Sequence, residues 1–288
     1  SLMPALAVAG FIALYVFGLP YPLVVLGAGV IGYAVAKRMA MDKTVQPESD
    51  VDTEIVVRAG TKRAALACLL LWLLTVGGLL ALLGKDNVYS QIAVFFSKMA
   101  MVTFGGAYSV LAYVAQQAVE NFQWLQPGEM LEGLGLAETT PGPLILVTQF
   151  VGFLAAYREA AIEPSLLYAS LGALLTLWVT FLPCFLWIFV GAPHVEKLRA
   201  NQSLSAAMAA ITAVVVGVIA NLALWFAANA LFAEQHRIAA FGVDMSLPVP
   251  GSVDLPMLVL SALAFVLVFW LRSGILWLLG ISATLGAL

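Results

Sequence analysis

Residues 135–150 of the chain read GLAETTPGPLILVTQF, which is an interruption in a very apolar sequence. The stretch places an acid, two threonines and two prolines around a glycine, and long apolar runs lie on both sides of it. Because proline lacks a backbone N–H group and clashes with the preceding turn, a helix that reaches this stretch ends or kinks there. The pattern predicts a membrane helix over 130–157 that is split into two half-helices at 138–143.

The composition around this stretch is that of a membrane protein. Of the 288 residues, 62% are hydrophobic and 10% are charged, whereas soluble domains have roughly 25% charged residues. Since about 20 apolar residues cross a bilayer, four further segments are long enough to span it: 64–83, 91–117, 164–190 and 204–232. The shorter apolar pieces 5–17, 23–35, 258–271 and 274–288 suit hairpins or half-helices. We predict an all-α integral membrane protein, a transporter-like helical bundle with broken or re-entrant helices.

Several functional classes are disfavoured by the residues present. The net charge of −3 and the lack of a basic stripe argue against a nucleic-acid partner. Cys68 and Cys184 both lie in apolar runs, which favours packed thiols over a disulfide or a metal site. The sequence has no HExxH motif, no paired aspartates and no Gly-x-Ser-x-Gly elbow, so a membrane-embedded enzyme is poorly supported. We expect neither a cofactor nor a metal.

The segment 37–63 is the one long polar stretch of the chain. It carries six basic residues, and the excess of lysine and arginine in cytoplasmic loops places it in the cytoplasm. The division of the basic loop residues between the cytoplasmic and the opposite side is the same whether 130–157 crosses the membrane or is re-entrant, so the charges do not distinguish the two topologies. The number of crossings therefore stays open.

The two ends of the chain resemble each other. Residues 10–32 read GFIALYVFGLPYPLVVLGAGVIG, and residues 264–286 read AFVLVFWLRSGILWLLGISATLG. Each has a short apolar piece, a turn, a second apolar piece and then small residues, and internal repeats of this kind are common in transporters. We expect three parts: 1–36, the terminal helical hairpin of a preceding repeat that this chain lacks; 37–63, a cytoplasmic linker; and 64–288, one complete repeat.

The ETTPGP motif suits the binding of an anion. Thr140 is placed to cap a helix that begins at Pro141, where proline is favoured. The first backbone N–H groups of such a helix, together with its dipole, attract negative charge. Thr139 adds a second hydroxyl, and Gly142, next to Pro143, leaves room for a ligand at the backbone. The alternative is a proline-kinked helix that binds nothing.

A second candidate break lies in SKMAMVTFGGAYSV, residues 97–110. Gly105 and Gly106 either break a helix or let another helix approach closely. Lys98 lies two turns before Gly105 on the same face. A lysine at membrane depth by default indicates function, although it can also snorkel to a nearby interface. Thr103 adds a hydroxyl near the glycines, and we expect this break to lie close to the ETTPGP break.

Glu138 is the most deeply placed acid in the predicted membrane segments. It is able to pair with Lys98, to carry a proton, or to accept hydrogen bonds from backbone N–H groups freed by the break. A carboxylate beside an anion is repulsive unless it is protonated or paired, so we assign Glu138 a coupling or gating role.

Two of these stretches resemble the chromate ion transporter family. They are FFSKMAMVTFGGAYSVLAYV, residues 95–114, and GLAETTPGPLILVTQFVGF, residues 135–153. Members of that family look like two homologous halves, each with an FGG-type and a PGP-type element, and some are single halves that work in pairs. This chain has one element of each type, so it is similar to the C-terminal half of a long-chain member. The resemblance implies a multi-pass protein of the bacterial inner membrane that exports chromate and gives chromate resistance.

The sequence therefore favours a transporter that holds a tetrahedral dianion, chromate or a sulfate-like oxyanion, between two broken helices. The expected substrate-binding residues are Lys98, Thr103, Gly105, Gly106, Thr139, Thr140, Pro141, Gly142 and Pro143, with Glu138 in coupling or gating. The expected partners are the lipid bilayer and an N-terminal homologous half or a second copy of the chain. The alternatives are a transporter of another oxyanion such as sulfate and a non-transporting membrane subunit.

Overall fold

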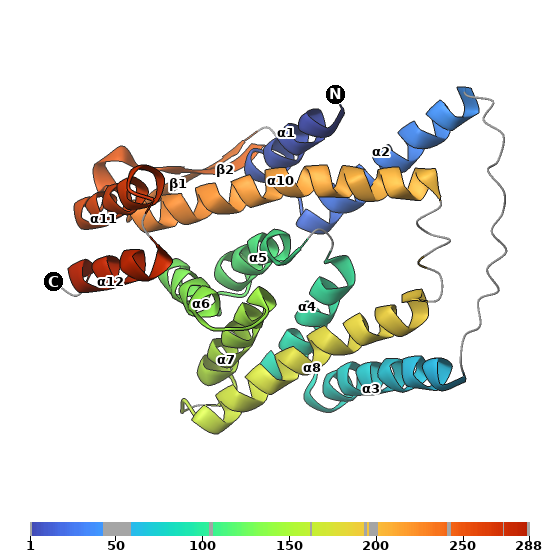
Figure 1. The fold of residues 1–288 in the computed structure, drawn as a ribbon. Helices are drawn as coiled ribbons and strands as arrows, with labels where there is room; N and C mark the ends of the chain where they lie inside the picture. Colours follow the sequence, from blue (N-terminus) through green and yellow to red (C-terminus); the bar gives the residue numbers. More distant parts are fainter. Residues whose placement is uncertain are drawn as a thin grey trace. The chain divides into compact units, whose positions relative to one another are not determined.

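A computed structural model of the chain describes residues 2–42, 59–103, 106–161, 163–192, 195, 201–240, 243–272 and 274–286. Helices dominate the described residues, and their only sheet is a two-stranded one (Figure 1). The prediction of an all-α membrane transporter is confirmed. The chain divides into two compact units, one of Ser1–Tyr15 with Leu19–Leu222 and one of Val16–Gly18 with Ala223–Leu288.

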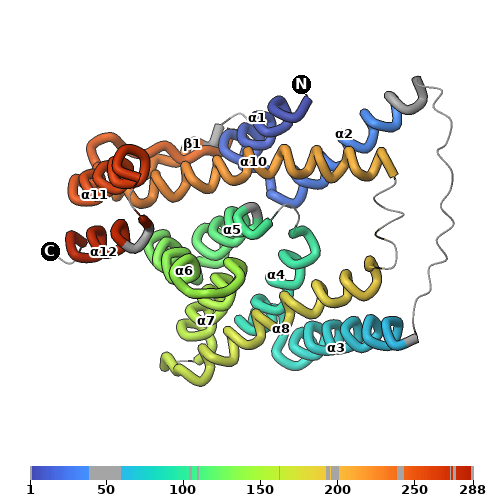
Figure 2. Tube along the Cα trace, viewed as in Figure 1, coloured from blue at the N-terminus to red at the C-terminus, as the bar shows by residue number. Residues whose placement is uncertain are grey.

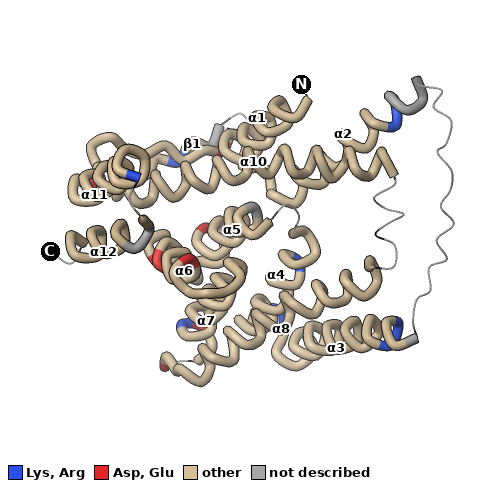
Figure 3. Tube along the Cα trace, in the orientation of Figure 1, with Lys and Arg blue, Asp and Glu red and all other residues tan. Residues whose placement is uncertain are grey.

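Three helices are long and apolar enough to cross a membrane: α3 (Ala59–Leu83), α8 (Leu166–Gly191) and α10 (Gln202–Leu231). Charged residues occupy only a small part of these helices (Figure 3). At 1.5 Å per residue each is longer than the roughly 30 Å of the hydrocarbon core. They coincide with the predicted segments 64–83, 164–190 and 204–232.

The fourth predicted span, 91–117, is not one helix. It is divided into α4 (Val88–Val102) and α5 (Ala107–Gln116), and the π-helical turn η1 (Gln117–Asn121) follows α5. Gly106 precedes α5 with φ 109°, a backbone conformation that is open to glycine and strained for residues with a side chain. The helix is therefore interrupted at Gly106, and a break was one of the two interpretations of the sequence.

The predicted split of 130–157 is confirmed. The helix α6 (Pro127–Thr139) ends before the proline motif, and the chain becomes helical again in η2 (Leu144–Leu146), which continues directly into α7 (Val147–Glu159). Figure 2 follows the chain through α4, α5, α6 and α7. Each of these helices is too short to span a bilayer.

Glycines set the closest helix contacts in the first unit. A Cβ atom added to Gly172 of α8 would lie 2.5 Å from the carbonyl oxygen of Gly152 on α7. Gly152 in turn faces Thr176, one turn further along α8. Small residues let membrane helices approach closely enough for dispersion contacts between their backbones. The contact between α7 and α8 thus fixes the position of the half-helix that follows the ETTPGP motif.

The first two helices, α1 (Leu2–Tyr15) and α2 (Tyr21–Asp42), pack on α10 in the same way. A Cβ atom on Gly217 of α10 would lie 2.7 Å from the backbone nitrogen of Phe11. A Cβ atom on Gly32 of α2 would lie 2.5 Å from the Cβ of Ala210. Both contacts bring one helix against the backbone of the other.

The second unit contains a feature that the sequence did not predict, an antiparallel hairpin of β1 (Gln235–Ala240) and β2 (Val243–Pro248). Arg237 binds Asp244 through two hydrogen bonds of 2.7 and 2.6 Å, and the Asp244 N–H group donates to the Val16 carbonyl at 2.8 Å. After a short turn, η4 (Pro250–Ser252), the chain ends in α11 (Leu255–Phe265), η5 (Val266–Trp270) and α12 (Ile275–Gly286).

The two chain ends each form a pair of helices in contact, α1 with α2 and α11 with α12. This arrangement is compatible with the similarity of residues 10–32 and 264–286. That the two pairs belong to homologous repeats stays a prediction, as does the division into 1–36, 37–63 and 64–288.

Candidate functional site

Both threonines of the ETTPGP motif are bonded to the helix that precedes them. The Thr140 hydroxyl donates to the carbonyl of Leu136 at 2.7 Å, and its backbone N–H group donates to the same oxygen at 3.0 Å. The Thr139 hydroxyl donates to the Gly135 carbonyl at 2.9 Å. The prediction that Thr140 caps a following helix is therefore wrong, because Thr140 closes the C-terminal end of α6.

The following helix begins later than predicted, at Leu144 rather than at Pro141. The reason is local: Pro143 disfavours a helical conformation of the residue before it, Gly142. Pro143 is the N-cap and accepts a hydrogen bond from the Leu146 N–H group at 2.9 Å. Gly142 is exposed, and a Cβ atom there would meet a single close atom, Leu146 Cδ1 at 3.2 Å. Exposed backbone thus lies in front of a helix start, the place where backbone N–H groups favour an anion.

The first break has a similar construction. The Thr103 hydroxyl donates to the Met99 carbonyl at 2.7 Å and so closes the end of α4. Helix α5 starts after Gly106 with no side-chain cap. Gly105 lies outside the described residues, so its predicted role and its distance from Gly142 lie outside them as well.

Lys98 is an exposed residue on a helix that is otherwise well packed. Its neighbours Ser97 and Met99 are buried, and the Ser97 hydroxyl accepts a hydrogen bond of 2.8 Å from the Trp72 indole. The ion pairs found among the described residues are Arg158–Glu129 and Arg237–Asp244. The suggested pairing of Lys98 with Glu138 is not formed within that part of the chain.

Glu138 instead connects the two breaks. The Tyr108 hydroxyl, in the first turn of α5, donates to Glu138 Oε1 at 3.2 Å, and Glu138 lies in the last turn of α6. In addition, Cα atoms of α5 and η2 come within 8 Å of each other. The elements on either side of the two motifs are therefore neighbours, which agrees with the expectation that the breaks lie together.

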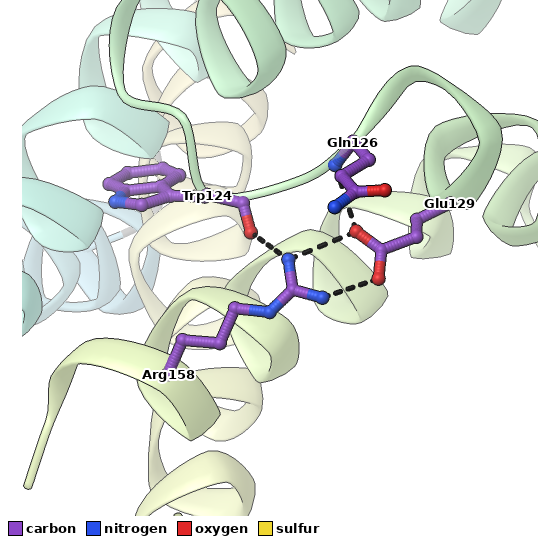
Figure 4. A network of polar contacts seen from close by, with 4 residues as sticks. All are labelled: Trp124, Gln126, Glu129 and Arg158. Atoms are coloured by element: carbon purple, nitrogen blue, oxygen red, sulfur yellow. Dashed lines mark hydrogen bonds and ion pairs between the residues drawn. The ribbon is translucent and has the colours of Figure 1, made fainter.

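A polar cluster that the sequence did not single out lies at the other end of α6 and α7 (Figure 4). Arg158 donates to Glu129 from both terminal nitrogens, with Nη1 2.9 Å from Oε2, and Nη1 also donates to the Trp124 carbonyl at 2.7 Å. The Gln126 N–H group donates to Glu129 at 2.8 Å and completes a capping box at the start of α6. The spacing of Gln126 and Glu129 around Pro127 is a sequence signal for this cap, but nothing local predicts Arg158.

The Trp124 side chain anchors this cluster in the interior. It is almost fully buried and contacts the rings of three phenylalanines, with ring centroids 4.2 to 6.4 Å apart: Phe95, Phe96 and Phe122. Aromatic packing of this kind holds the carbonyl that Arg158 binds in a fixed position. The hydrogen bonds from Arg158 lower the pKa of the Glu129 carboxyl group, so the pair stays charged near neutral pH.

Comparison with known proteins identifies the family. A family model described as Chromate transporter matches residues 90–287. The chain belongs to the chromate transporter family. The match begins within α4 and includes both breaks, the cluster at Arg158 and the helices that follow. This confirms the resemblance that the two motifs carry.

Several curated relatives in the chromate transporter family are similar to the chain. A probable chromate transport protein of Synechococcus elongatus is 24% identical over 64% of the chain and 44% of its own length. Chromate transport proteins of Cupriavidus metallidurans and Pseudomonas aeruginosa are 27% and 29% identical over 49% and 56% of the chain, and over 32% and 35% of their own lengths. The chain thus aligns with less than half of each of these relatives. No solved structure shows a significant match.

Proposed function

We propose that this member of the chromate transporter family carries chromate, a tetrahedral oxyanion, across the bacterial inner membrane. The observation that carries the proposal is the meeting of two broken helices at the Tyr108–Glu138 hydrogen bond, with the exposed residue Gly142 just before a helix start. Interrupted helices whose ends point at a substrate are the usual construction of ion sites in membrane transporters. The names of the relatives support chromate as the substrate.

The backbone at the second break is the main binding element in this proposal. The N–H groups of Gly142 and the first residues of η2 bind the oxyanion, and the helix dipole adds favourable charge. Pro141 and Pro143 donate no backbone hydrogen bond, so they shape the turn. The hydroxyls of Thr139 and Thr140 donate their protons to backbone carbonyls of α6. In this arrangement neither hydroxyl proton is available to the oxyanion.

The first break supplies the complementary part. Lys98 offsets part of the ligand charge, and the backbone at Gly105 and Gly106 together with Thr103 completes the site. Glu138 repels a dianion unless it is protonated or hydrogen-bonded, and Tyr108 provides such a bond. We therefore assign Glu138 to coupling or gating rather than to substrate binding.

Export is the direction we propose, because removal of chromate from the cell gives resistance. The working unit contains this chain and an N-terminal homologous half or a second copy, since a site between repeats needs both repeats. The proposed organisation remains a terminal hairpin at 1–36, a linker at 37–63 and one repeat at 64–288. A sulfate-like oxyanion is the alternative substrate, because sulfate shares the shape and charge of chromate.

Thermal unfolding in detergent of the purified working unit, this chain together with a co-expressed N-terminal half, with and without added anions, tests the binding proposal. A ligand at about 100 times its dissociation constant stabilises a protein by roughly 2.7 kcal/mol. We expect chromate to raise the unfolding temperature, sulfate to raise it less, and nitrate at equal ionic strength to leave it unchanged. Equal effects of all three anions would contradict a site for tetrahedral dianions. Uptake of labelled chromate into proteoliposomes then separates transport from binding by a non-transporting subunit.

A further inference from the structure

The contacts in the first unit bear on how residues 88–159 meet the membrane. We infer that 88–121 and 127–159 form two re-entrant hairpins that enter from the same, non-cytoplasmic side and carry the two breaks at their tips. The location of the substrate site at these tips rests on the proposed function. The hairpins themselves rest on contacts alone.

The second hairpin is defined by contacts at its base and at its middle. At the base, Glu129 near the start of α6 binds Arg158 near the end of α7. At the middle, a Cβ atom on Gly133 of α6 would lie 2.5 Å from the ring of Phe150 on α7. In each pair, one residue precedes the turn at 140–143 and the other follows it. Helices α6 and α7 are therefore antiparallel, and segment 127–159 begins and ends at the same end of the hairpin.

The length of this hairpin limits its depth. Helix α6 has 13 residues, which corresponds to about 20 Å at 1.5 Å per residue. A bilayer core is about 30 Å thick. The turn at 140–143 therefore lies within the membrane, and the segment does not cross it.

The first hairpin begins at the same side. The Tyr89 hydroxyl, at the start of α4, donates to the carbonyl of Tyr168 at 3.0 Å, and Tyr168 lies in the first turn of α8. The base of the second hairpin is also there, because α7 leads into α8 through the short connection 160–165 and is antiparallel to it, with Gly152 facing Thr176 and Ala156 facing Gly172.

The first hairpin also returns to that side. After the break, α5 and η1 lead to Trp124, whose carbonyl is bound by Arg158 at the base of the second hairpin. Across the two arms, Phe95 of α4 contacts Tyr113 of α5 and then Phe122 beyond η1, with ring centroids 5.6 and 5.4 Å apart. Segment 88–121 thus enters on α4 and leaves on α5 and η1.

The membrane side follows from α3. This helix begins directly after the basic segment 37–63, which the excess of lysine and arginine places in the cytoplasm. Helix α3 is long and apolar enough to cross the membrane, and four residues separate its end from the start of α4. The start of α4, and with it the base of both hairpins, therefore lies on the non-cytoplasmic side. The tips meet through Tyr108 and Glu138, which makes Tyr108 a positioning residue for the proposed site.

Cysteine labelling in whole cells tests the two hairpins without any requirement for transport. In a background with Cys68→Ser and Cys184→Ser, single cysteines are placed at exposed base positions: Gly128→Cys for the second hairpin and Asn121→Cys for the first. The references are Asp86→Cys, between α3 and α4, and Gln202→Cys, at the cytoplasmic start of α10. The probe is a membrane-impermeant maleimide, and outer-membrane permeability is provided in every sample.

We expect Gly128→Cys, Asn121→Cys and Asp86→Cys to react in intact cells, and Gln202→Cys to react only after the inner membrane is permeabilised. Reaction of Gly128→Cys or Asn121→Cys only after permeabilisation, with Asp86→Cys reactive, would show a crossing and overturn the hairpins. Protection of all three together would overturn the assigned side. Because labelling reports position alone, a failure here is distinct from a failure of chromate binding or transport.

Discussion

At the scale of single residues, Gly142 matters most for the proposed site, since it is exposed and comes just before a helix start. Its φ angle is not in the left-handed region, and its one close neighbour is the flexible end of Leu146. A larger side chain at this position therefore changes access to the backbone more than it changes the fold.

We expect Gly142→Leu to weaken chromate binding while leaving the protein folded. The leucine side chain fills the space in front of the N–H groups of η2, and a tenfold loss of affinity corresponds to about 1.4 kcal/mol. The measurement is the chromate concentration that gives half-maximal stabilisation in detergent. Gly135→Leu, at an exposed site of α6 with nothing within 4 Å, is the matched control. Equal affinity in both variants would indicate that the motif only kinks the helix and binds no anion.

Asp244 provides a pH-dependent prediction. The hydrogen bonds from Arg237 lower the pKa of this exposed carboxyl group below its usual value. Because the folded pKa is the lower one, the pair contributes stability above the unfolded pKa and loses it as the pH falls through the folded pKa. We expect Arg237→Gln to raise the pKa of Asp244 toward the ordinary value of about 3.9, measured by NMR titration of the carboxyl carbon. Arg272→Gln serves as the control, and an unchanged titration in Arg237→Gln would contradict the assignment.

At the scale of elements, the half-helices depend on two kinds of contact. Polar bonds join their ends, at Tyr108 with Glu138 and at Arg158 with Glu129. Glycine contacts fix α7 on α8. The Tyr108–Glu138 bond connects the elements beside the two breaks, the Arg158–Glu129 pair joins the far ends of α6 and α7, and the glycine contacts hold α7 against α8.

We expect Tyr108→Phe to lower the maximal transport rate more than it changes the affinity for chromate. The substitution removes one hydrogen bond to a carboxylate, which contributes about 1.5–3 kcal/mol, so the decrease is on the order of tenfold or more. Glu138→Gln keeps an acceptor for the tyrosine but removes the carboxyl group that is assigned to coupling or gating, so it should lower the rate at least as much. Initial rates in proteoliposomes give the two parameters separately. A loss of affinity with an unchanged rate would place Tyr108 in the binding site instead.

Gly172→Ala should destabilise the contact between α7 and α8. The added methyl group would clash with the Gly152 carbonyl and with Ala156, and overpacking of this kind costs about 1–3 kcal/mol. The measurement is the unfolding temperature in detergent. Gly78→Ala in α3 adds the same methyl group with nothing within 4 Å, so it should leave the temperature unchanged or raise it slightly. Equal unfolding temperatures of the Gly172→Ala and Gly78→Ala variants would contradict a close contact between α7 and α8 at Gly172.

At the scale of the whole molecule, the chain holds one break of each type and aligns with less than half of the relatives' lengths. Helices α1 and α2 pack on α10 through Gly32 and Gly217. The proposed terminal hairpin is therefore closely packed against the proposed repeat. A binding site between two repeats is still incomplete without the second one.

We expect residues 1–288 expressed alone to give no chromate resistance unless two copies associate. Co-expression with a separately encoded N-terminal half should restore resistance in chromate-sensitive cells. Membrane levels of the chain are matched by immunoblot, and its oligomeric state is measured by mass photometry in detergent. Resistance from a monomeric chain would refute the requirement for two halves.

The sequence by itself determined the membrane class, three helices long enough to span a bilayer and the break at the ETTPGP motif, whereas at Gly105 and Gly106 it left a break and a close helix approach as alternatives. These features depend on local properties, namely apolar length and the backbone restrictions of proline and glycine at positions such as Pro143 and Gly106. The motif spacing was also sufficient to indicate the family. The sequence did not predict the β-hairpin, in which Arg237 pairs with Asp244 across two strands.

Only the tertiary structure decided how the broken segments are arranged. Thr140 suits either a helix start or a helix end, and its bond to Leu136 selects the second. Tyr108 with Glu138 and Glu129 with Arg158 are separated by 30 and 29 residues. Periodicity and turn chemistry do not reach across such separations, because these pairs form only after α6 has folded back against its neighbours. The same contacts carry the inference that 127–159 enters and leaves on one side, which counting charges left open.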